Sequence, residues 1–218
     1  MPHPSPATNQ SEQPRTQAER TAQAESSMIL AAIDLLNSVG IQGTTLVAIG
    51  ERSGYSRGLA SHHFGSKSGL LRTVLKRMTA VWTEKLVQNL DGKTGLQAIA
   101  TAIDTHLEHV LRHPDYLRAM NILWGAALDP ASEFKPNVAE FMRIQRDSVA
   151  AWVRGGQELG EIAMDIDALR VAEQFYGTLI GLNNQWLVAP EIDLRAAYAD
   201  YKQNVLRLLS APARKGND

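Results

Sequence analysis

The segment TTLVAIGERSGYSRG, residues 44–58, decides the fold, because it contains two helix starts and one helix end within fifteen residues. Thr44 or Thr45 can cap a short helix, and Ser56 can cap a second one. Between them, Gly54 supplies the backbone freedom that a tight turn requires. Two short helices joined by such a turn predict a helix-turn-helix.

In a helix-turn-helix, the N-terminal residues of the second helix face base edges in the DNA major groove, and the first helix crosses the backbone. On this geometry, the residues placed to read bases are Ser56, Arg57, Leu59 and Ala60. Thr45, at the start of the first helix, is placed to support the contact with the DNA backbone. Arg57 can either contact a guanine through two hydrogen bonds or bind the phosphate backbone. The motif by itself also occurs in helical proteins that bind no nucleic acid.

The charge distribution singles out the same part of the chain. Its 218 residues carry a formal net charge of −1, yet between Glu51 and Arg77 six basic residues face a single acidic one. The local charge is therefore +5, and the remainder of the chain sums to −6. Such a division is typical of a domain that touches a polyanion and is attached to one that does not.

The residues around the motif resemble the TetR family of bacterial transcriptional regulators, from Ile29 to Leu71. The matching positions are Gly40, Thr44-Thr45, Ile49-Gly50, Gly54 and His63-Phe64-Gly65-Ser66-Lys67. The resemblance implies that Lys67, at the start of the next helix, grips a phosphate together with the helix end; the alternative is a solvated lysine. The residues expected to contact DNA are Thr45, Ser56, Arg57, Gly58, Leu59, Ala60, Ser61, His62, His63 and Lys67.

Three positions depart from the family pattern. The family usually has Ala where this chain has Gly50 and Ser53, and an aromatic residue where it has Ser61. Since Gly inside an exposed helix costs about 0.5–1 kcal/mol relative to Ala, Gly50 predicts a close approach between helices. The missing aromatic side chain at position 61 shifts the expected contacts toward His62 and His63.

The rest of the chain predicts an all-α fold, because apolar residues recur at three- and four-residue steps and no strand-like alternation is found. The predicted domains are a disordered N-terminal arm at 1–25 that includes Arg15 and Arg20, a helix-turn-helix domain at 26–72, a helical domain at 73–211 and a disordered tail at 212–218. The predicted helices are 26–40, 45–53, 56–64, 66–90, 96–113, one around 117–124, 132 to about 156–160, 167–188 and 194–209.

The C-terminal region is expected to dimerise and to bind a small effector. The resemblance implies a four-helix bundle built from the last two helices of each protomer, and Gly177 and Gly181 lie one turn apart where close packing would need them. It also implies a pocket for a small apolar or aromatic molecule. The residues predicted to bind that molecule are Trp82, Met120, Trp124 and Asn183.

Three histidines, His106, His109 and His113, fall on one flank of a predicted helix. Two interpretations stay open: part of a metal site, or a polar flank that faces solvent or the rim of a pocket. With no cysteine, disulfides and thiolate metal sites are excluded.

The leading hypothesis is a cytoplasmic, homodimeric repressor that binds a palindromic operator as double-stranded DNA and is released by an effector. No catalytic constellation, cofactor or metal site is predicted. No membrane span is predicted, since no apolar run approaches ~18 residues and the first 25 residues contain only Met1 and four alanines as apolar residues. The alternative is an all-helical small-molecule carrier or protein-interaction module without sequence-specific DNA binding.

Overall fold

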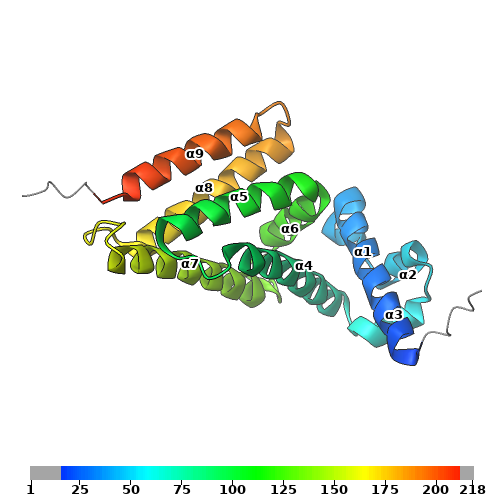
Figure 1. The fold of residues 1–218 in the computed structure, drawn as a ribbon. Coiled ribbons are helices and arrows are strands. Elements are labelled where there is room, and N and C mark those ends of the chain that lie inside the picture. Colours follow the sequence, from blue (N-terminus) through cyan, green and yellow to red (C-terminus); the bar gives the residue numbers. More distant parts are fainter. Residues whose placement is uncertain (1–15, 212–218) are drawn as a thin grey trace, which may run out of the picture.

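The computed structural model describes residues 16–211, which form nine α-helices and one isolated β-bridge between Ile162 and Ser210. Figure 1 shows α1 to α3 gathered at one end of an elongated molecule, with α4 leading from them into a larger bundle that contains α5 and α7 to α9. The helices are α1 (Gln17–Gly43), α2 (Leu46–Ser53), α3 (Arg57–Phe64), α4 (Lys67–Leu90), α5 (Gly95–Arg112), α6 (Pro114–Ala126), α7 (Lys135–Glu158), α8 (Ala168–Val188) and α9 (Leu194–Leu209).

Side-chain caps start the three helices of the motif region as predicted. The backbone N–H of Ala48 donates to Thr45 Oγ1 at 3.1 Å, and the N–H of Leu59 donates to Ser56 Oγ at 3.1 Å. Ser66 caps α4 in the same way. Thr45, rather than the buried Thr44, is therefore the cap of α2.

The first helix begins earlier than predicted. Thr16 and Glu19 form a capping box, in which each side chain accepts a hydrogen bond from the other residue's backbone N–H. Ala24 is buried in the core, so the expectation of a disordered arm is wrong for residues 17–25. Residues 1–15 and the tail at 212–218 lie outside the described residues. The predicted end at Gly40 coincides with a kink, where φ is +68° and the helix axis is interrupted.

Two hydrophobic cores divide the molecule. The N-terminal core combines α1, α2, α3 and the first half of α4 with α6 and the start of α7, which contribute Leu123 and Val138. The C-terminal core combines the second half of α4 with α5, α7, α8 and α9. The predicted boundary after residue 72 therefore falls inside α4, because one continuous helix packs into both cores.

Among residues 16–211, α1 is the one helix long and apolar enough to cross a membrane by length and composition. Its buried residues, which include Met28, Ala32 and Leu36, pack in the N-terminal core against α2, α4 and α6. This packing is that of a core helix in a folded domain.

Candidate functional site

The turn between α2 and α3 is shaped by two glycines. Gly54 adopts a left-handed conformation with φ +77° and ψ 17°, which ends α2 and turns the chain toward α3. A Cβ built on Gly50 would lie 2.9 Å from the carbonyl oxygen of Tyr55 and 3.0 Å from the backbone nitrogen of Arg57. The close approach predicted at Gly50 is confirmed, and it is made by the turn backbone rather than by a side chain.

Helix α3 turns one face outward and the other into the N-terminal core. Arg57, Gly58 and His62 are exposed, and Ser61 between them is partly exposed. Ala60 is fully buried, as is nearly all of Phe64. Ala60 therefore cannot touch DNA, and its inclusion among the reading residues is corrected.

The remaining α3 residues of the predicted set are only partly available. Leu59 is half-buried and packs against the N-terminal core. His63 is also partly buried, with its ring 5.9 Å from that of His62 and 6.0 Å from that of Phe64. The outward face of α3 is thus built chiefly from Arg57, Gly58, Ser61 and His62.

Hydroxyl and ammonium groups flank this face. The Thr45 and Ser56 hydroxyl oxygens each accept one capping hydrogen bond, which leaves their protons free to donate to another group. Lys67 is the first residue of α4, as predicted, and its Nζ donates to the carbonyl oxygen of Gln42 at 3.2 Å. That bond ties the start of α4 to the end of α1 and holds the ammonium near the motif.

Fewer of the six basic residues offer an unpaired charge near α3 than the sequence suggests. Arg52 forms an ion pair with Asp34, and Arg72 lies 3.6 Å from Glu133. Lys76 and Arg77 follow Lys67 by nine and ten residues on α4, roughly 14–15 Å along the helix. Within the described chain, Arg57 forms no ion pair, so its charge on α3 is available to a partner.

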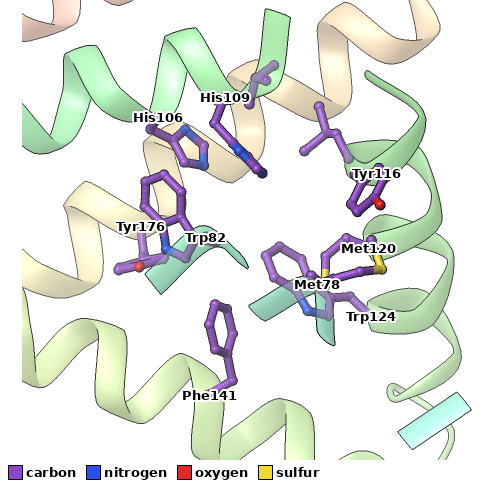
Figure 2. Close-up of a pocket in the computed structure, with 11 residues that line it drawn as sticks. Met78, Trp82, His106, His109, Tyr116, Met120, Trp124, Phe141 and Tyr176 are labelled. Carbon is purple, nitrogen blue, oxygen red and sulfur yellow. The ribbon is translucent and has the colours of Figure 1, made fainter. Parts of the chain in front are cut away.

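A cavity lies between α4, α5, α6, α7 and α8, where the two cores meet (Figure 2). Its lining is Met78, Trp82, His106, His109, Val110, Tyr116, Leu117, Met120, Trp124, Phe141 and Tyr176. Its volume is about 60 Å³. An engineered apolar cavity that holds benzene measures about 150 Å³, so a ligand of that size requires the walls to move.

Three of the four residues predicted to bind the effector meet here: Trp82, Met120 and Trp124. Asn183 does not line the cavity. It is 2% exposed, and its Oδ1 accepts a hydrogen bond from the Tyr198 hydroxyl at 2.8 Å. Its prediction as a lining residue is corrected, because α8 turns that position toward α9.

Two polar groups of the cavity wall are already satisfied by one side chain. Gln145 Oε1 accepts hydrogen bonds from Trp82 Nε1 at 3.0 Å and from the Tyr176 hydroxyl at 2.5 Å. Burial raises the pKa of the Tyr176 hydroxyl above its ordinary value, so it stays protonated and remains a donor. This arrangement fixes the two aromatic rings on one side of the cavity.

The histidines of α5 differ sharply in environment. His106 is partly buried, its Nδ1 lies 2.8 Å from the Tyr198 hydroxyl, and burial together with the neighbouring His109 lowers its pKa to about 3. The pKa of His109 is lowered mainly by burial and also by His113, whereas His113 itself is exposed. No group of three or more metal-binding side chains is found in the described part of the chain, and the pocket-rim interpretation fits His106 and His109.

Several lining residues were not selected from the sequence, among them Met78, Tyr116, Phe141 and Tyr176. Their aromatic or thioether side chains look the same in sequence as those of ordinary core residues. The flank shared by His106 and His109 was the available signal, since two histidines beside an apolar arc mark a polar rim.

Residues 29–74 match the family model described as bacterial regulatory proteins, tetR family. Over 80 residues, the chain is 36% identical to the HTH-type transcriptional regulator BetI of Burkholderia ambifaria, and over 78 residues it is 35% identical to BetI of Klebsiella pneumoniae. These matches cover 34% and 33% of this chain. The chain spans only 41% and 40% of the length of these relatives.

The fold as a whole is similar to solved structures of low sequence identity. A TetR-family transcriptional regulator from Rhodococcus sp. superposes with a TM-score of 0.74 at 18% identity, over 87% of this chain and 100% of that one. The SmeT–triclosan complex gives 0.73 at 21% identity, over 87% and 93% of the two chains. Both matches extend beyond the motif into the C-terminal helices, so the similarity of fold includes the region of the cavity.

Proposed function

We propose that this chain is a TetR-family repressor that binds a palindromic operator as a homodimer and is released by a small, mostly apolar effector. The match of residues 29–74 to the tetR family model and the similarity of fold support this proposal. The observation that carries the proposal is the pairing of an exposed basic recognition helix with an aromatic cavity at the junction of two cores. The two sites share α4, and α6 packs against both α1 and α4.

For DNA, α3 enters the major groove with Arg57, Gly58, Ser61 and His62 toward the bases. Thr45, Ser56 and Lys67 position the motif through phosphate contacts, which fix orientation without reading sequence. His63 and Leu59 contribute at the edge of this surface, since both are partly exposed.

For dimerisation, α8 and α9 supply the interface. A Cβ built on Gly177 or Gly181 meets no atom of the other described residues within 4 Å, apart from its chain neighbours and the nearby backbone of α8, so this strip of α8 is open to close approach by another helix. Half-buried apolar residues, Leu182 and Trp186 on α8 and Tyr201 on α9, flank that strip. A two-fold contact would complete their burial on both protomers at once.

For release, the effector acts through the spacing of the two recognition helices. These must lie about 34–36 Å apart to enter successive major grooves. A ligand larger than the cavity of about 60 Å³ separates its walls, and those walls include α4 and α6, which carry the N-terminal core. The SmeT structure contains triclosan, which supports effector binding in this fold.

Selection of bound duplexes from a random pool, with all 218 residues of the chain, tests the proposal. We expect a palindrome with half-sites about one helical turn apart. Arg57→Ala should relax the sequence preference within each half-site, whereas Arg154→Ala, which removes a charge from exposed α7 surface, should leave the selected sequence unchanged. Failure to enrich any sequence would refute sequence-specific binding.

A further inference from the structure

A buried chain of hydrogen bonds connects three helices behind the cavity. Asn183 on α8 accepts from the Tyr198 hydroxyl of α9 at 2.8 Å, and the same hydroxyl lies 2.8 Å from Nδ1 of His106 on α5. Tyr198 is 1% exposed and Asn183 is 2% exposed, so water does not compete for these bonds. The last member of this series of hydrogen bonds, the His106 imidazole, lines the cavity.

The number of protons available in this series of hydrogen bonds determines the tautomer of His106. A tyrosine hydroxyl has one proton to donate, and Tyr198 gives it to Asn183 Oδ1. The short contact between Tyr198 and His106 therefore uses the imidazole Nδ1–H as donor. Since a neutral imidazole carries one proton, Nε2 is left with a free lone pair and can only accept.

The unprotonated nitrogen, Nε2 of His106, faces the cavity. Figure 2 shows His106 between Trp82 and His109 with one ring nitrogen turned toward the open space. Within residues 16–211, Nε2 has no hydrogen-bond partner. The Trp82 ring meets the His106 ring edge-on at a centroid distance of 5.0 Å, which holds the imidazole plane in place.

The chemistry of the wall restricts what can bind. None of its eleven lining residues is Asp, Glu, Lys or Arg, so a charged ligand would lose its hydration without gaining a counter-ion. The donors of Trp82 and Tyr176 are already used by Gln145. An acceptor at His106 Nε2 calls for a ligand with a hydroxyl or N–H group.

We propose that His106 Nε2 is the group that selects the effector, accepting a hydrogen bond from a hydroxyl or N–H of an otherwise apolar, uncharged molecule, while Tyr198 and Asn183 are positioning residues that fix the imidazole tautomer. This rests on the proposed function, because it assigns the ligand class of the same cavity. The lowered pKa of His106 supports it, since the ring stays neutral and able to accept at physiological pH.

His106 is preferred over His109 and Trp124, two other polar side chains of the wall. His109 has no hydrogen bond to a described residue and lies beside exposed His113, with ring centroids 5.4 Å apart, so nothing fixes its tautomer. Trp124 Nε1 is buried and has no acceptor within the described chain. If Trp124 selected the ligand, an acceptor would be favoured instead of a donor, and this difference can be measured.

The first test is the tautomer itself in the free protein. Nitrogen-15 NMR of histidine-labelled protein distinguishes a protonated from a bare ring nitrogen, and His106→Phe assigns the signals. We expect a protonated Nδ1 and a bare Nε2 for His106. In Asn183→Leu, Tyr198 loses its acceptor and turns its proton to His106 Nδ1, so the two signals should exchange. A protonated Nε2 in the unaltered protein overturns the proposal.

The second test is a ligand series of nearly constant shape, in which phenol offers a donor, anisole only an acceptor and toluene neither. Dissociation constants measured by NMR titration without DNA should favour phenol over both others by about two- to tenfold, the effect of one hydrogen bond. His106→Phe should abolish this preference while retaining toluene binding. Tyr198 keeps Asn183 as its partner in that variant, so no buried hydroxyl is orphaned.

The positioning role has its own readout. Tyr198→Phe should reduce the preference for phenol over anisole to about one, because the tautomer is no longer fixed. Asn183→Leu should instead favour anisole, because Nε2 then carries the proton and donates. His113→Phe, at the residue that follows α5 and lies outside the cavity lining, should keep the full preference. Equal binding of phenol and toluene by the unaltered protein, or its stronger binding of anisole, refutes the assignment. Because no DNA is present, either result is separate from any failure of operator binding.

Discussion

Acidification should destabilise the fold through His106. Burial lowers the pKa of His106 from 6.5 to about 3, with a further contribution from His109. The unfolded chain therefore binds a proton at this position across the pH range from about 6.5 down to 3, whereas the folded chain does not. The folded state has its full stability above pH 6.5 and loses it as the pH falls toward 3.

The magnitude follows from proton linkage. At pH 5.5 the unfolded imidazole is about ten-elevenths protonated, which lowers the free energy of unfolding by about 1.4 kcal/mol per protomer relative to pH 7.5. The lowered pKa of His109 acts in the same direction. The difference between the unaltered protein and His106→Gln isolates the contribution of His106, because other titrating groups are common to both.

Urea unfolding followed by circular dichroism, at one protomer concentration and at pH 7.5 and 5.5, measures this difference. Fixed concentration is required because dimerisation contributes to apparent stability. His106→Gln should lose about 1.4 kcal/mol less than the unaltered protein between the two pH values. An equal loss in both proteins would show that His106 is protonated in the folded state and would refute the reasoning.

Four further expectations concern the turn, the DNA contacts, the dimer and release. Gly50→Ala should lower the free energy of unfolding by about 1–3 kcal/mol through overpacking against the turn backbone, whereas Gly58→Ala, whose Cβ meets only Ser56 Oγ at 3.7 Å, should raise it by about 0.5–1 kcal/mol; thermal unfolding compares the two. Lys67→Ala should weaken binding to all duplexes similarly and reduce the slope of log affinity against log salt by about 1. Arg57→Ala should cost about 1–3 kcal/mol of binding free energy at one base pair of each half-site. Equal effects of Arg57→Ala on selected and random DNA would exclude a reading role. Leu182→Arg should give monomers that retain their helix content, measured by light scattering and circular dichroism, because the charge enters a two-fold contact twice; a dimeric variant would locate the interface elsewhere. Saturating phenol should weaken operator binding, and operator DNA should weaken phenol binding by the same factor; unchanged operator affinity across the titration would exclude coupling.

Much of the secondary structure can be predicted from short stretches of the sequence. The caps at Thr45, Ser56 and Ser66 and the turn at Gly54 depend on residues within four positions of one another, so side-chain chemistry and backbone preference are sufficient to place these elements. The apolar periodicity located all nine helices of the described chain for the same reason. The start of α1 at Gln17 was missed, because only tertiary burial distinguishes Ala24 from an alanine in a disordered arm.

Only the tertiary structure shows which residues line the cavity and which face of α3 is exposed. Periodicity gives the face on which a residue lies but not what packs against that face, so it could not show that Ala60 is buried or that Asn183 turns toward α9. The sequence by itself determined a helix-turn-helix with a basic second helix. The packing of α5, α8 and α9 brings His106 Nδ1 within 2.8 Å of the Tyr198 hydroxyl. The sequence could not show this contact, because Tyr198 is 92 residues away in the chain.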